Sequence, residues 1–171
     1  PDVVALHCFA YSRWDQVWLE ARGYLNRLMP QLSSASTRLM SLGLRYVDQF
    51  NFKLSLDHFD PAKLLRENKH LHSAAFASGA RWHCHTGWFD ESETPEVLNQ
   101  LNINSVVPVP GDIVADPLIA IEHLQIIRSQ PSANLSRYLL MSDHGESLDN
   151  LMQRMHDSNK LVVLELLQPD V

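Results

Sequence analysis

The sequence predicts an α+β domain: a mainly antiparallel sheet of about five strands, with two long helices, 13 to 32 and 147 to 167, packed against one face. Two observations support this. Apolar residues recur at helical spacing near both ends of the chain, and every second position is apolar in several segments between them. With 171 residues, of which 45% are hydrophobic, the chain fits a single domain spanning 1–171.

The first elements are a short strand and a long helix. Val3 to Phe9 is apolar and rich in strand formers. Ser12 stands at a helix-capping position with Asp15 three residues later, which predicts a helix start at residue 13. The apolar stripe of this helix then follows spacings of three and four: Trp14, Val17, Trp18, Ala21, Leu25, Leu28, Met29 and Leu32.

The next predicted strand runs from Arg38 to Asp48, with alternate residues on opposite faces. Its more apolar face and the helix stripe are the largest apolar surfaces of the chain. We therefore expect six residues to be largely buried together: Trp14, Trp18, Leu25, Leu42, Leu44 and Tyr46.

The remaining elements are predicted from helix-capping residues, from residues that interrupt strands, and from the spacing of apolar residues. Asp60-Pro61 predicts a short helix over 62–67, and 68–72 is a loop. Strands are expected over 74–89, 100–109 and 118–128, the second returning antiparallel from an acidic turn. The last apolar stripe predicts one long or briefly interrupted helix from Ser147 to about Leu167.

Composition narrows the class of protein. The chain has 14 Lys and Arg residues and 20 Asp and Glu residues, and its basic residues form no continuous block. We therefore expect no general nucleic-acid binding. No apolar run is long enough for a bilayer, so no membrane association is expected. Cys8 and Cys84 lie in apolar segments and are expected to be reduced and buried, in a cytoplasmic protein. The start at Pro1, almost at once in a strand, suggests that an N-terminal segment of the full-length protein is missing.

Several segments in order resemble a family. Tyr11-x-x-Trp14-Asp15, the strand Leu42-Gly-Leu-Arg-Tyr-Val-Asp48 and the closing helix look like a sporadically distributed family of uncharacterised bacterial proteins. Its strand typically reads Gly-Leu-Arg-Tyr-Ile-Asn, whereas this chain has Val47-Asp48 at the end. It also has Met155-His156 for a Leu-His pair, and Gln168 where the family tends to have Thr. The resemblance implies architecture and carries no activity.

Three charged residues are candidates for binding a ligand or a partner: Arg45, Arg81 and Glu122. Arg45 lies in the Gly-Leu-Arg-Tyr motif between apolar residues. A buried arginine needs an anion, so we expect either a structural partner, namely Asp48, Glu122 or a helix C-terminus, or a bound acidic group. The structural pairing is favoured.

Three histidines are candidates for a metal site. His83 and His85 alternate onto one strand face, and His123 lies in another strand. The sequence holds no HExxH, CxxC or phosphate loop, and we predict no cofactor. The adjacent letters of Ser142-Asp143-His144 do not make a triad, which is a three-dimensional arrangement.

Two functions follow. A well-specified scaffold with aromatic-rich strands and no recognisable catalytic motif predicts a non-enzymatic interaction module that binds a protein partner or self-associates through a sheet edge or face. The alternative is a metal-assisted hydrolase that uses the strand histidines His83, His85 and His123.

Overall fold

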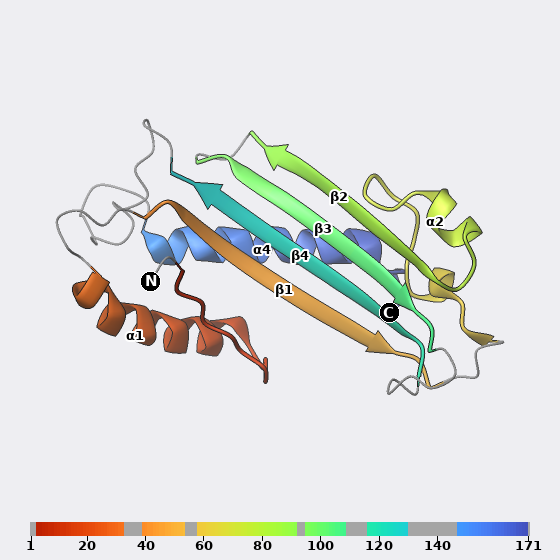
Figure 1. The fold of residues 1–171 in the computed structure, drawn as a ribbon, viewed down its shortest axis with the longest axis horizontal. Coiled ribbons are helices and arrows are strands. Elements are labelled where there is room, and N and C mark those ends of the chain that lie inside the picture. Colours follow the sequence, from red (N-terminus) through yellow and green to blue (C-terminus); the bar gives the residue numbers. More distant parts are fainter. Residues whose placement is uncertain are drawn as a thin grey trace.

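The structure, a computed structural model, describes residues 3–32, 39–53, 58–91, 95–108, 116–129 and 147–170. These residues form an α+β fold around one four-stranded sheet in the order β1-β4-β3-β2 (Figure 1). The strands are β1 (Ser41–Asn51), β2 (Trp82–Asp90), β3 (Val97–Val106) and β4 (Leu118–Arg128), and each neighbouring pair is antiparallel. The helices are α1 (Trp14–Leu32), α2 (Ser73–Ala77) and α4 (Leu148–Leu166), with a 3-10 turn, η2, at Pro61–Lys63.

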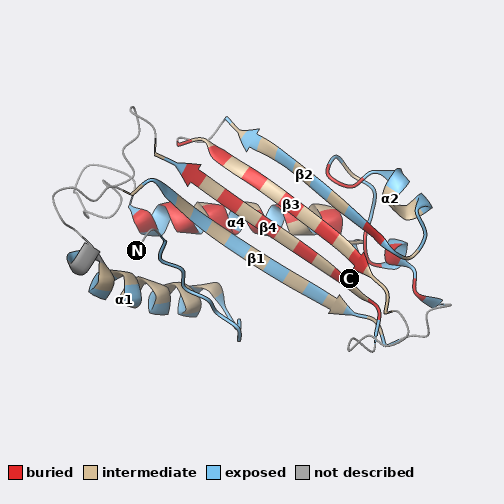
Figure 2. Ribbon diagram, in the orientation of Figure 1, coloured by how far each residue is buried: buried red, intermediate tan, exposed pale blue. Residues whose placement is uncertain are grey.

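The core lies between the sheet and α4. Alternate residues of β3 and β4 are buried (Figure 2) and meet the apolar stripe of the helix. One cluster surrounds the helix C-terminus and includes Leu65, Leu71, Leu101, Ile103, Ile119, Ile121 and Leu166. A second surrounds its N-terminus and comprises Val97, Ile127, Leu148, Leu151, Met152 and Met155. One helix therefore closes the whole length of the two central strands.

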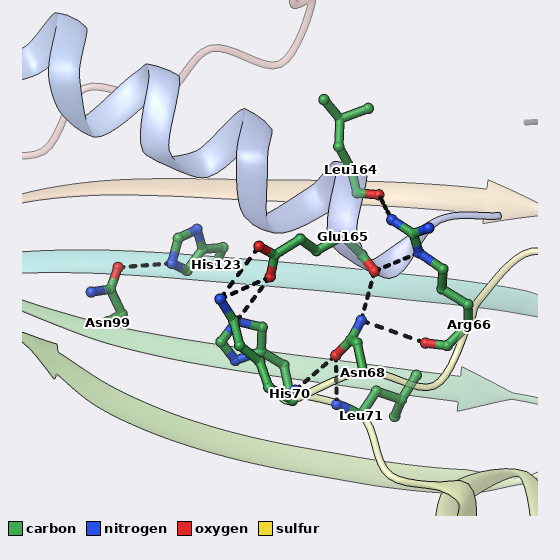
Figure 3. A network of polar contacts seen from close by, with 9 residues as sticks. Arg66, Asn68, His70, Leu71, Asn99, His123, Leu164 and Glu165 are labelled. Atoms are coloured by element: carbon green, nitrogen blue, oxygen red, sulfur yellow. Dashed lines mark hydrogen bonds and ion pairs between the residues drawn. The ribbon is translucent and has the colours of Figure 1, made fainter. Parts of the chain in front are cut away.

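Both ends of α4 are capped. Ser147 Oγ accepts a hydrogen bond from the backbone amide of Asn150, 3.2 Å away, and so caps the first turn of the helix. At the other end the loop after η2 supplies donors to carbonyls that the helix leaves unbonded (Figure 3). Arg66 donates to the carbonyl oxygens of Leu164 and Glu165, and Asn68 Nδ2 donates to the latter at 2.7 Å.

Helix α1 rests on the first turns of α4 through its aromatic side chains. Trp14 Nε1 donates to Gln153 at 2.7 Å and Trp18 Nε1 to Asp149 at 2.8 Å. Of the six residues expected to form a common core, Trp14, Trp18, Leu25, Leu42 and Leu44 all pack against the second cluster. All six are partly buried rather than fully buried, because β1 is an edge strand and α1 covers it incompletely.

The expected count of about five strands is not confirmed, since the described residues form four. Val3 to Phe9 is exposed and has no strand assignment, so strand-forming residues alone did not produce pairing. The predicted strand over 74–89 is divided: α2 occupies its start, Gly79 takes a φ of +83° in the turn, and β2 begins only at Trp82. The helix predicted over 62–67 is the shorter turn η2.

The two cysteines differ. Both are free thiols, but Cys8 is exposed, against the expectation of burial, because its segment joins no sheet. Cys84 is half-buried in β2, and burial raises the pKa of its thiol. Within the described residues, no helix has the length and apolar character needed to cross a bilayer.

Candidate functional site

The sheet has one open face, which we define by the outward residues of its four strands. These are Ser41, Gly43, Arg45, Val47, Gln49 and Asn51 of β1; His83, His85, Gly87 and Phe89 of β2; Leu98, Gln100, Asn102, Asn104 and Val106 of β3; and Leu118, Ala120, Glu122, Leu124 and Ile126 of β4. All of them are exposed or half-buried, and Figure 2 shows the resulting exposed stripes on β1 and β2. The three described helices contact inward-facing residues instead.

The strand register arranges the open face in rows across the sheet. Each row contains one residue from each strand, in the order β1, β4, β3, β2. The four complete rows are Gly43, Ile126, Leu98 and Phe89; Arg45, Leu124, Gln100 and Gly87; Val47, Glu122, Asn102 and His85; and Gln49, Ala120, Asn104 and His83. Apolar side chains dominate the first row and polar ones the last two.

Two of the predicted binding residues meet on this face. Arg45 Nε donates to Glu122 Oε1 at 2.7 Å, and this bond to the carboxylate raises the pKa of Arg45. Glu122 was one of the expected partners. However, the pair is not buried, because the side chains are 55% and 26% exposed. It is therefore a surface ion pair, whose expected contribution to stability is at most about 1 kcal/mol.

Arg81, the third predicted binding residue, is exposed and lies immediately before β2. The predicted metal ligands His83 and His85 do share the open face, and their ring centroids are 6.4 Å apart. His83 Nδ1 is 2.6 Å from Asn104 Oδ1. His83 is therefore engaged in a hydrogen bond between neighbouring strands, as is common for histidine in a sheet, and this nitrogen is not available to a metal ion.

His123 lies on the opposite face of the sheet, so the three predicted imidazoles do not converge. It is buried under α4, with Nδ1 2.9 Å from Asn159 Oδ1 and Nε2 3.1 Å from Asn99 Oδ1. The expected three-histidine metal centre is therefore wrong in its geometry. Among the residues that the structure describes, no group of three or more His, Cys, Asp or Glu side chains is arranged to hold a metal ion. Ser142 to His144 fall outside those residues.

The buried polar cluster around His123 serves the contact between sheet and helix. The Trp88 ring lies between two imidazoles, with ring centroids 4.2 Å from His70 and 5.8 Å from His123. Glu165 Oε2 lies 3.7 Å from His70 Nε2 (Figure 3). The same oxygen lies 3.1 Å from Lys69 Nζ. Burial is the main cause that lowers the pKa of both histidines, which favours neutral rings at neutral pH.

A neutral ring at His123 also constrains its two neighbours. Such a ring donates from one nitrogen and accepts at the other. The amide nitrogen of Asn99 is already used by the Val97 carbonyl at 3.3 Å, so Asn99 is the acceptor and the amide of Asn159 must turn to donate. His123, Asn99 and Asn159 are thus buried and hydrogen-bonded to one another, and they join β3 and β4 to α4.

Sequence reasoning missed the apolar part of the open face. Phe89 is 58% exposed and Val47 49% exposed. The signal was present, because Phe89 has the same strand parity as His83, His85 and Gly87. The partners of His123 carried no such signal, since they depend on how α4 docks onto the sheet.

Comparison of the chain with protein-family models, curated proteins and solved structures finds no match. The resemblance of the Gly43-Leu-Arg-Tyr46 strand to an uncharacterised bacterial family stays a prediction.

Proposed function

We propose that this chain is a non-enzymatic interaction module that binds protein through the open face of its sheet. The observation that carries the proposal is the exposure of Phe89, in the row of Leu98 and Ile126, and of Val47, diagonal to Leu124. Leu98, Leu124 and Ile126 remain half-buried although they lie on the two central strands. Contiguous exposed apolar surface of this kind is typical of protein interaction sites. The proposal includes the cytoplasmic location expected from the sequence.

The polar residues of the face also favour a protein partner. Arg45 is paired with Glu122, and His83 with Asn104, within the chain. A partner can therefore cover these groups without having to supply a counter-charge, because each retains its hydrogen bond when water is excluded. The face thus offers apolar contact area, and a partner does not have to supply a charged group to bind it.

The proposal is tested by placing a photo-crosslinking amino acid at position 47 and, in a separate variant, at position 164, in the cells that express the protein. Leu164 is a matched control because it is also an exposed aliphatic residue, at 63%, but on α4. We expect discrete protein adducts from position 47 that weaken when Phe89→Glu is added. Equal labelling from both positions, or none from position 47, would contradict the proposal.

A further inference from the structure

We infer that the protein covering the open face is a second copy of this chain, in a symmetric dimer with the two sheets packed face to face. The inference rests on the proposed function and names its partner. Three features of the face carry it: its area, the distribution of large and small side chains over its rows, and the internal pairing of its charges.

The area suits a stable dimer. Four strands about 4.8 Å apart, with about ten residues each at about 3.3 Å per residue, give the face a flat area of roughly 600 Å². Two such faces bury roughly 1,200 Å² in total, and the relief of the side chains adds to this. Stable protein interfaces bury about 1,200 to 2,000 Å². The open face reaches the area of a stable interface only if the partner surface is as broad as the face itself. An identical face has this breadth.

The rows match themselves when reversed. A two-fold axis parallel to the strands places β1 opposite β2 of the second copy and β4 opposite β3, with each row facing its own reverse. In the first row, the large Phe89 then lies opposite Gly43 of the second copy, and Ile126 lies opposite Leu98. In the next row, Arg45 lies opposite Gly87. Both edge glycines thus leave room where the facing edge strand carries a long side chain.

The charges on the face tolerate this burial. The Arg45 and Glu122 pair closes at 2.7 Å within each copy, so the dimer leaves no charge without a partner. His83 likewise keeps Asn104 at 2.6 Å. The stacking of two identical sheets also agrees with the aligned sandwich geometry, in which side chains from both inner faces interdigitate.

Sedimentation equilibrium of the purified chain tests the inference. We expect a monomer–dimer equilibrium in which Phe89→Glu raises the dissociation constant at least about thirty-fold, the weakening typical of losing a large aromatic side chain at an interface. The matched control Leu164→Glu, which puts the same charge at an exposed leucine on α4, should change it less than about three-fold. Circular dichroism confirms that both variants fold.

A cysteine pair tests the two-fold axis. In a Cys8→Ser background, Gln49→Cys together with His83→Cys should give a cross-linked dimer with a short bifunctional maleimide, because row reversal places the two positions opposite each other across the gap of about 10 Å between packed sheets, which is wider than a disulfide spans. Within one chain these positions lie on opposite edge strands, about 14 Å apart, so identical positions of the two copies are farther apart still. Each single cysteine variant should give no cross-linked dimer for the same reason.

The outcomes separate the inference from the proposed function. A chain that stays monomeric at about 100 µM overturns the second-copy inference, since stable protein interfaces have dissociation constants of about 1 µM or lower. Adducts of position 47 with another protein would then still support the proposed function. A dimer that survives Phe89→Glu, or that links through a single cysteine, also overturns the inference. Loss of the dimer with Phe89→Glu, together with linkage by the double variant only, supports it.

Discussion

Replacing Asn68 tests how α4 is held at its C-terminus. The Asn68 side chain makes three short hydrogen bonds: Nδ2 donates to the Glu165 carbonyl at 2.7 Å, and Oδ1 accepts from the amides of His70 at 2.7 Å and Leu71 at 3.0 Å. Asn68→Ala removes all three. The amides of His70 and Leu71 are then left without an acceptor. Because both residues are buried, each unbonded amide lowers the free energy of unfolding by about 1 to 2 kcal/mol. The Glu165 carbonyl keeps its bond from Arg66 and adds little. The expected loss in the free energy of unfolding is about 2 to 4 kcal/mol.

Asn68→Asp is the matched control. The carboxylate keeps an acceptor for both amides but loses the donor, and it places a negative charge near the carbonyl end of the helix dipole. We expect a loss of about 1 to 2 kcal/mol, smaller than for Ala. Urea unfolding followed by circular dichroism, at one protein concentration for all variants, measures both values. An Ala variant within about 0.5 kcal/mol of wild type, or an Asp variant that loses as much as Ala, would refute the reasoning.

Three further predictions concern the core, the surface pair and pH. Ile121→Ala should lower the free energy of unfolding by about 2 to 5 kcal/mol, since Ile121 is fully buried, whereas Leu164→Ala should change it by less than about 0.5 kcal/mol in the same urea series. A double-mutant cycle of Arg45→Ala and Glu122→Ala, on monomeric protein, should give a coupling of about 0.2 to 1 kcal/mol that falls with added salt; a coupling near 3 kcal/mol would mean that the pair is buried. Burial lowers the pKa of His70, His123 and His156 in the fold below the ordinary value of 6.5. The unfolded chain then binds more protons, so stability is complete above pH 6.5 and falls as the pH drops below it, by up to about 1.4 kcal/mol per pH unit per histidine. His123→Gln should flatten this slope in unfolding curves between pH 7.5 and 5, and an unchanged slope would count against a neutral His123.

The elements with a clear spacing of apolar residues could be predicted closely. The strand expected over 118–128 is β4, Leu118–Arg128, and the last helix differs from its predicted bounds by about one residue at each end. The apolar stripe of this helix depends only on the spacing of residues along its own segment. Local signals of this kind do not depend on what the rest of the protein does.

Features that depend on tertiary contacts could not be predicted. In β4 both faces are apolar, with Ile119, Ile121 and Ile127 on one side and Leu124 and Ile126 on the other. Period alone therefore could not tell which face carries His123, and the three-histidine hypothesis assumed the wrong one. The strand predicted over Val3 to Phe9 is absent for a related reason, because a strand forms only where another strand offers hydrogen bonds.

The position of β1 has a consequence for folding order. β2 and β3 pair as neighbours along the chain, and β3 pairs with β4 next. β1 instead joins β4 across a long span, Ser41 opposite Arg128 and Asn51 opposite Leu118. Closing so large a loop costs entropy before any contact compensates for it, so we expect β1 to dock last, onto a sheet that β2, β3 and β4 have already formed. The strand that carries Arg45 and Val47 is then the last part of the open face to be completed, and a partner that needs all four rows can bind only after the final step of folding.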